Sequence, residues 1–276
     1  MRRAPSISRR ARREGKATPA DGDTDRDAVP TLLAGRVVLV TGAAYGLGRD
    51  LALGLSASGA AVGLVDDAAT GPVAARITES GGEAVAVDAP VQSRADAADA
   101  FETVAGALGP LNAVVHASLD LDAMIPAPVV GLADSEWDTR CEAPLRRALA
   151  CTQAAFTHLR PHGGRLVFIT PTVALTGAAR LVPCTTALEG IRGLAKSAAR
   201  QWGQHGITVN CVAPPLELLA ADGRDAPEPT VGGAALGRGP DGRRDVAPVV
   251  AWLASPSAGF VTGLTVTVDG GIVMAP

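Results

Sequence analysis

The chain has few aromatic residues, few cysteines and no long apolar run. Its 276 residues include one Tyr, three Trp and four Phe, too few to suggest a pocket lined by aromatic rings. The four cysteines form no CxxC pair and have no histidine cluster nearby, which argues against a disulfide framework or a zinc site and favours reduced thiols in the cytoplasm. Nowhere do 18 apolar residues follow one another without a charge or a helix breaker, so no membrane-spanning helix is expected.

The first 30 residues offer almost nothing that a core could bury, and we expect residues 1–30 to form a disordered arm. Seven basic side chains lie within residues 1–16 and four aspartates within residues 21–27. The arm has two interpretations, a tether to nucleic acid or another anionic surface and a solvated leader, and it lacks the apolar segment of a secretory signal. Beyond residue 30 the chain has 17 basic and 23 acidic residues, and an acidic body argues against nucleic acid as its main ligand.

Apolar runs alternate with amphipathic segments over residues 31–276, which predicts a single α/β domain. Strands are expected at 36–41, 60–65, 83–87, 111–116, 165–169, 206–212 and 265–268. Helices are expected at 46–58, 71–80, 94–108, 137–159, 183–202 and 245–255. Near-continuous apolar strands indicate a parallel sheet covered on both faces, a doubly wound fold with its ligand crevice at the carboxyl ends of the strands. Residues 216–243 break this rhythm and predict a long loop that forms a lid on the substrate side.

A glycine-rich turn follows the first expected strand and opens the first helix. It reads Thr-Gly-Ala-Ala-Tyr-Gly-Leu-Gly over residues 41–48, and its glycines permit a tight turn and the close approach of a pyrophosphate to the helix N-terminus. Asp66 ends the second strand, where a carboxylate can accept hydrogen bonds from an adenosine ribose and repel a 2′-phosphate. The pattern therefore predicts a dinucleotide site that prefers NAD(H); the alternative is that the glycines serve only helix packing.

This turn and four later segments resemble the short-chain dehydrogenase/reductase family, in particular its 3-oxoacyl-carrier-protein reductase-like branch. The later segments are Gly-Ile-Thr-Val-Asn-Cys-Val-Ala-Pro at 206–214, Gly-Arg-Gly at 237–239, Asp-Val-Ala at 245–247 and Val-Thr-Gly-Leu-Thr-Val-Thr-Val-Asp-Gly-Gly at 261–271. The resemblance covers residues 34–273 and implies a Rossmann fold. The cofactor-binding residues that it implies, together with the glycine turn, are Thr41, Gly42, Tyr45, Gly46, Leu47, Gly48, Asp66 and Val91.

The four catalytic residues of that family are absent from this chain. The positions that match its Asn, Ser, Tyr and Lys are Pro144, Pro171, Cys184 and Leu188. The family's Tyr protonates the alkoxide that hydride transfer creates, while its Lys lowers the pKa of that Tyr. Neither proline nor leucine has a side-chain donor, and Pro144, within the expected helix 137–159, should remove a hydrogen bond and kink it.

Two side chains near the lost positions are weak candidates for other chemistry. Cys184 could act as an acid or a nucleophile, but without a neighbouring Lys its thiol has nothing to lower its pKa, and with Leu188 it forms an apolar i,i+4 pair suited to packing. His116 replaces the first Asn of the family's Asn-Asn-Ala-Gly after the fourth strand, so it could act as a base or be a neutral strand-end histidine. Further changes at 90–91 and 214–215 suggest a nicotinamide half less well held than the adenosine half.

Three functions remain open from the sequence. The first is a pseudoenzyme that pairs, in a homo- or hetero-oligomer, with a catalytically active relative through its two long helices and C-terminal segment, as the resemblance implies. The second is a divergent oxidoreductase or non-redox enzyme that acts on acyl thioesters or ketones through Cys184 or His116. The third is an NADH sensor that responds through the loop at 216–243. No metal, nucleic acid or membrane is expected as a partner.

Overall fold

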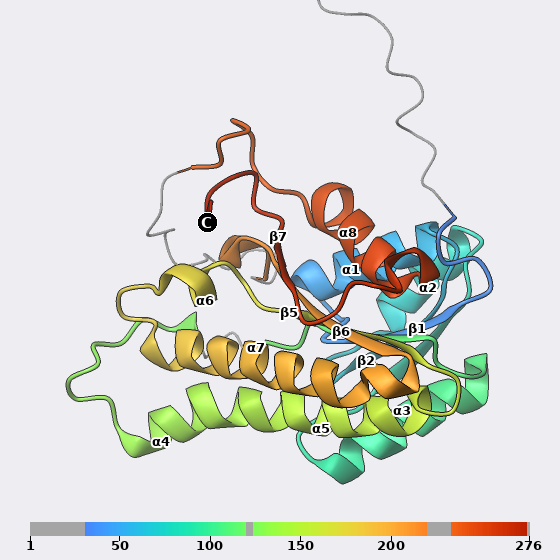
Figure 1. Ribbon diagram of the computed structural model, residues 1–276, viewed down its shortest axis with the longest axis horizontal. Helices are drawn as coiled ribbons and strands as arrows, with labels where there is room; N and C mark the ends of the chain where they lie inside the picture. Colours follow the sequence, from blue (N-terminus) through green and yellow to red (C-terminus); the bar gives the residue numbers. More distant parts are fainter. Residues whose placement is uncertain (1–30, 120–123, 220–232, 275–276) are drawn as a thin grey trace, which may run out of the picture.

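The computed structural model describes residues 31–119, 124–219 and 233–274, and shows one sheet between two layers of helices (Figure 1). Its seven strands are all parallel and are arranged in the order β3-β2-β1-β4-β5-β6-β7. The expected arm at 1–30 and most of the expected lid, residues 220–232, lie outside the described residues. The strands are β1 Val37–Thr41, β2 Ala61–Asp66, β3 Ala84–Asp88, β4 Ala113–His116, β5 Gly164–Ile169, β6 Ile207–Ala213 and β7 Thr265–Thr267.

The helices cover both faces of this sheet, as the continuous apolar strands predict. Helices α3, α5 and α7 pack together on one face, and α1, α2 and α8 on the other (Figure 1). The α-helices are α1 Gly46–Ala57, α2 Gly71–Glu79, α3 Arg94–Leu108, α4 Asp134–Trp137, α5 Ala143–Leu159, α6 Val173–Thr176, α7 Val182–Trp202 and α8 Ala247–Ala254. The doubly wound fold and the single domain are confirmed, and each strand lies within two residues of its expected position.

Each face of the sheet has its own apolar core. The core beneath α3, α5 and α7 contains Phe101, Leu159 and Phe168, and the core beneath α1, α2 and α8 contains Leu51, Leu64 and other fully buried side chains. The strand side chains alternate between the two cores because successive residues of a strand point to opposite faces. Among the described residues, no helix is long and apolar enough to span a membrane.

The helix expected at 137–159 is present but irregular. A π-helical turn, η2 Asp138–Glu142, lies between α4 and α5, and the backbone stays helical from one into the next. Pro144, the second residue of α5, directly follows this turn. The expected irregularity of the helix near Pro144 is thus found as a π turn, and the kink at Pro144 stays a prediction. The helix expected at 245–255 likewise divides into a π-helical turn, η5 Gly242–Val246, and α8.

Candidate functional site

The glycine turn lies at the carboxyl ends of β1 and β4, and its backbone permits no side chain at two positions. Gly42 has φ of 74°, and a Cβ there would lie 2.7 Å from the backbone of Ser118. A Cβ on Gly48 would lie 1.8 Å from the carbonyl oxygen of Gly42, so α1 starts in direct contact with the turn. Gly46 also has a positive φ, of 52°. The sequence therefore needs glycine here for conformation and close approach.

The start of α1 and the end of β2 supply groups that suit a nucleotide diphosphate. Tyr45, the N-cap residue of α1, makes no side-chain hydrogen bond to the first turn, and that turn contains no acid, so the helix N-terminus favours an anion. The Asp66 carboxylate accepts hydrogen bonds from the N–H groups of Ala44 at 2.9 Å and Ala68 at 3.0 Å. Burial raises the pKa of Asp66, and these two hydrogen bonds oppose that shift.

The space between these groups is narrow. Two cavities lie along the crevice, of about 40 Å³ and about 20 Å³. Drug-sized ligands occupy sites of about 300–1,000 Å³, and cavities this small hold only a few waters. The donors and the carboxylate therefore fit a dinucleotide, whereas the volume in this conformation does not. The expected cofactor residues nonetheless come together: all except Gly46 line one or both cavities, namely Thr41, Gly42, Tyr45, Leu47, Gly48, Asp66 and Val91.

Arg147 narrows the crevice, and sequence reasoning missed it. Its half-buried side chain comes from α5 and lines both cavities together with Gly42, Asp66 and Ser118. Leu219, at the end of the 3₁₀ turn η4 Leu216–Leu219, closes the larger cavity. The sequence did contain a signal, because Arg147 follows Pro144 by three residues and so shares its helix face, next to the crevice.

His116 ends β4 directly beside Thr41 of β1. Its Nδ1 lies 2.8 Å from the Thr41 hydroxyl, and its ring meets Phe168 edge-on. The side chain is 2% exposed, and its Nε2 has no hydrogen-bond partner. Burial, with a smaller contribution from the charge of Arg147, lowers the pKa of His116 to about 4. His116 is thus a neutral histidine at a strand end, the structural alternative considered for it above.

The positions that match the family's tetrad lie in apolar surroundings. Cys184 and Leu188 are both 0% exposed, and Pro144 and Pro171 are also buried. Cys184 and Leu188 belong to one continuous core cluster that also contains residues from β5, β6 and both sides of the crevice: Leu119, Met124, Ile169, Val173, Val212, Leu216 and Leu219. The packing role expected for the Cys184 and Leu188 pair is confirmed.

The thiol of Cys184 is poorly suited to catalysis. Burial raises its pKa to about 12, and the nearby thiol of Cys141 adds to the shift. Cys184 lies in the first turn of α7, where a helix N-terminus favours a thiolate, but a nucleophilic cysteine also needs some exposure, and Cys184 has none. All four cysteines are free and buried. Within the described residues, no group of three or more His, Cys, Asp or Glu side chains could hold a metal ion.

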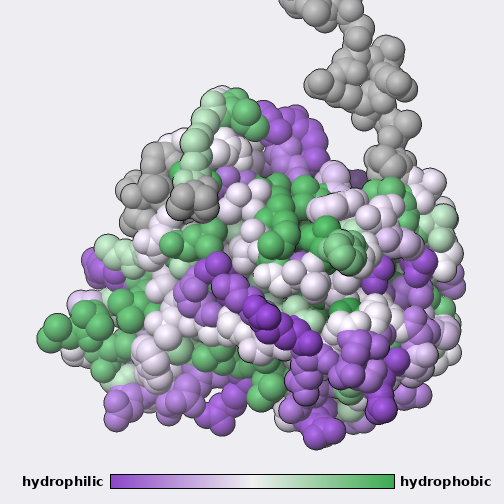
Figure 2. Space-filling view, viewed as in Figure 1, coloured by the Kyte–Doolittle hydropathy of each residue, from purple (hydrophilic) through white to green (hydrophobic). Residues whose placement is uncertain are grey.

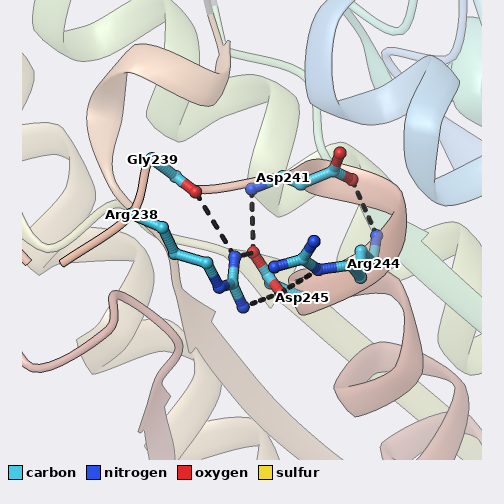
Figure 3. Close-up of polar contacts among 5 residues, drawn as sticks. All are labelled: Arg238, Gly239, Asp241, Arg244 and Asp245. Atoms are coloured by element: carbon cyan, nitrogen blue, oxygen red, sulfur yellow. Dashed lines mark hydrogen bonds and ion pairs between the residues drawn. The ribbon is translucent and has the colours of Figure 1, made fainter. Parts of the chain in front are cut away.

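The chain that returns from the expected lid is fixed by a network of charges (Figure 3). Arg238 donates two hydrogen bonds of 2.6 Å to the Asp245 carboxylate, one to each oxygen. That carboxylate also accepts from the N–H of Asp241 at 2.9 Å, and the Asp241 side chain caps η5 by accepting from the N–H of Arg244 at 2.8 Å. Arg238 lowers the pKa of Asp245 more than any other group does. This network joins the 237–239 segment to η5, the turn that leads into α8.

Comparison with known proteins shows what this fold and crevice are similar to. The family model described as enoyl-(acyl carrier protein) reductase matches residues 42–273. The short-chain reductase protein NovJ of Streptomyces niveus is 30% identical over 269 residues, 92% of this chain and 98% of that protein. The 3-oxoacyl-[acyl-carrier-protein] reductase FabG of Pseudomonas aeruginosa is 33% identical over 252 residues, 88% of this chain and 99% of its own length.

Solved structures agree with these relatives. A dehydrogenase/reductase from Sinorhizobium meliloti 1021 superposes with a TM-score of 0.76 at 29% identity and covers 90% of this chain and 98% of its own. The citronellol catabolism dehydrogenase AtuB of Pseudomonas aeruginosa has a TM-score of 0.76 at 25% identity, covering 88% of this chain and 97% of its own.

Proposed function

This chain belongs to the short-chain dehydrogenase/reductase family, and we propose that it is a non-catalytic member, a pseudoenzyme that acts by association with an active relative. The observation that carries this proposal is the apolar packing at the positions of the family's acid and its cation. Cys184 and Leu188 are fully buried in the same core cluster as the residues that flank the crevice. Neither side chain has any exposed surface through which solvent or a substrate could contact it.

The reaction of the family needs groups that this chain does not place at the crevice. Reduction of a carbonyl develops negative charge on its oxygen, and a placed acid that supplies the proton contributes about 10²- to 10⁴-fold in rate. Fixed hydrogen-bond donors at that oxygen contribute a comparable factor. Pro171 and Leu188 have no side-chain donor, and the hydroxyl of Thr172, which is 4% exposed, is a poor acid near neutral pH.

A divergent enzyme that uses Cys184 or His116 is the second candidate, and the geometry does not favour it. A thiol with a pKa of about 12 has almost no thiolate at neutral pH. His116 is neutral, but its 2% exposure gives it no contact with a substrate. A third candidate, an NADH sensor, depends on the loop at 216–243, most of which lies outside the described residues.

The proposed cofactor of the fold is a nicotinamide dinucleotide, held weakly and mainly by its adenosine half. The glycine turn, the N-terminus of α1 and Asp66 would hold the pyrophosphate and the ribose, and Asp66 favours NAD(H) because its charge opposes a 2′-phosphate. When bound in an active relative, the dinucleotide supplies the hydride. In this chain the two small cavities, about 40 Å³ and 20 Å³, mean that side chains must move before it can enter.

Apolar side chains on the surface support an association partner. Leu149 on α5, Phe260 after α8 and Leu264 before β7 are 45%, 104% and 54% exposed. A second group, Ile125, Val129 and Val130, lies on the segment that leads into α4, and Figure 2 shows hydrophobic side chains gathered at that end of the molecule. Apolar side chains that gather in a surface patch often mark sites of association.

A spectrophotometric assay tests the loss of catalysis. The purified chain should oxidise neither NADH nor NADPH with acetoacetyl-CoA, a 3-oxoacyl thioester of the class that the FabG relatives are named for, while the Pseudomonas aeruginosa relative turns it over under the same conditions. Steady turnover by this chain that disappears in Cys184→Ala or His116→Ala would replace the proposal with the second candidate.

Native mass spectrometry of the chain isolated from its source cells tests the association. The expected species is a mixed oligomer with a relative that has the family's Ser, Tyr and Lys. If only a homo-oligomer is found, the proposed association with an active relative is refuted. The proposed loss of catalysis would then still be decided by the spectrophotometric assay.

A further inference from the structure

The edge of the sheet opposite the crevice contains a larger hollow. It has a volume of about 590 Å³ and lies where the chain enters β1, β4, β5 and β6, the side at which residue 31 joins the domain (Figure 1). Ligand sites typically have volumes of about 300–1,000 Å³. The hollow is therefore the right size for a small molecule, with about ten times the combined volume of the two cavities at the glycine crevice.

Glycine turns that approach each other closely form one wall of this hollow. Gly163 has φ of 76° and Gly206 has φ of 70°, and the turns that contain them approach so closely that a Cβ on Gly163 would lie 3.0 Å from the Gly206 carbonyl oxygen. A Cβ on Gly164 would lie 2.6 Å from Leu159 and 2.8 Å from the Asn112 carbonyl oxygen. The three positions thus contribute backbone and no side chain to the wall.

The side chains that line the hollow are basic. Three arginines line it, Arg36, Arg160 and Arg165, together with His162 and His205. Among the described residues, no Asp or Glu lines it, and none of the three arginines forms an ion pair with another described residue. This is unexpected in a body with 17 basic and 23 acidic residues after residue 30, because cations on a folded surface normally have acidic neighbours.

Arg165 is held in place by the backbone. Its Nε donates to the Ser255 carbonyl oxygen at 3.2 Å and its Nη1 to the Gly164 carbonyl oxygen at 2.9 Å. Burial, and then the charge of Arg36, lower the pKa of its guanidinium. Arg36 and Arg165 both line the hollow, so an anion held between them would relieve the repulsion of their like charges. Asn112 adds an amide at the wall, whose Oδ1 accepts the N–H of Val37 at 2.9 Å.

We propose that this hollow is a binding site for a small phosphorylated molecule, whose phosphate group lies between Arg36, Arg160 and Arg165. Guanidinium groups pair with phosphate oxygens in a bidentate geometry, which makes arginine the usual residue for this recognition. The volume beyond the phosphate would hold the organic part of the ligand. The site is independent of the glycine crevice and of the loss of catalysis proposed above.

Thermal unfolding of the full chain tests the site, with inorganic phosphate and ribose 5-phosphate as probes and sodium chloride at equal ionic strength as the salt control. A probe at about ten times its dissociation constant should raise Tm by about 3 °C, and sodium chloride should not. A larger rise in Tm with ribose 5-phosphate than with inorganic phosphate would show that the hollow also binds the organic part of the ligand. An equal rise with the two probes would show that the site recognises the phosphate group alone.

Three variants locate the response. Arg160→Gln and Arg36→Gln should each weaken the apparent affinity at least tenfold, whereas Arg94→Gln, which removes an exposed charge at the start of α3 on the other edge of the sheet, should leave it unchanged. The proposal is overturned if sodium chloride gives the same Tm rise. It is also overturned if the response persists in Arg160→Gln and Arg36→Gln, because the phosphate would then be bound elsewhere, for example at the glycine turn.

Discussion

Arg147→Ala should open the dinucleotide crevice and strengthen the binding of NADH. Its side chain lines both the 40 Å³ and the 20 Å³ cavity, so truncation at Cβ removes a wall that they share. A ligand that must first displace this side chain binds more weakly by the free energy of the displacement. Hydrogen bonds of a charged group contribute about 1.5–3 kcal/mol each. Since the displaced guanidinium regains part of this in water, the net cost is about 1–2 kcal/mol, which corresponds to about 5- to 30-fold in affinity.

Calorimetric titration with NADH measures the effect, and the neighbouring residue supplies a matched control. Arg146 stands on the same helix, forms an ion pair with Glu142 and has a side chain that is 70% exposed. Arg146→Ala removes the same charge without touching the crevice, so its affinity for NADH should equal that of the unmodified chain. If Arg147→Ala instead weakens binding while Arg146→Ala does not, Arg147 is a ligand of the pyrophosphate and the reasoning from volume is refuted.

Three further predictions concern the buried side chains around the crevice. Leu188→Lys should lower the free energy of unfolding in urea by about 3 kcal/mol or more, because it places an ammonium in an apolar core, whereas Lys at the exposed Thr186 should change it little. The pKa of His116 is about 4 in the folded chain and 6.5 ordinarily, so the free energy of unfolding should depend on pH. The contribution of His116 should be complete above about pH 6.5, and about 3 kcal/mol of it should be lost as the pH falls to 4. Equal pH profiles of the free energy of unfolding for the unmodified chain and His116→Gln would contradict this. Iodoacetamide should modify Cys184 in the urea-unfolded chain but not in the native chain, because the native thiol is buried. Mass spectrometry of the peptide that contains Cys184 measures this, and rapid labelling of the native chain would show that the thiol is accessible.

The fold followed from the sequence because its signals are local and repeated. Each buried strand is a short apolar run, and the helices between them have an apolar face, so the order of elements and the parallel sheet could be predicted together. The π-helical turn at 138–142 was not predicted, because the helical pattern of residues 137–159 looks continuous in the sequence. Pro144, two residues beyond the turn, was the one helix breaker in that pattern.

The backbone conformation of the crevice could be predicted from the sequence, but the volume of the crevice could not. Gly42 and Gly48 are glycine because other backbone atoms lie within a few ångströms, where a Cβ would have to be. Such close contacts can be inferred from the glycine pattern in the sequence. Whether the crevice is open depends on how far Arg147 and Leu219 reach into it, which the spacing of residues along a helix does not determine. The basic hollow at the other edge was missed for a related reason, since Arg36, Asn112 and Arg165 come together only when β1, β4 and β5 are paired in register.

The replaced tetrad positions have become part of the folding core, and this bears on whether the reaction could be restored. A Tyr at 184 would have to fit where Cys184 is 0% exposed, and inserting extra atoms into a packed core costs about 1–3 kcal/mol. A Lys at 188 would place an ammonium among the apolar side chains of the core, so burying its charge would be costly. Because both positions belong to one cluster with Val173, Leu216 and Leu219, their costs are coupled. The family's reaction therefore cannot be recovered by exchanging side chains one at a time, since the pocket that they require is now filled by the core itself.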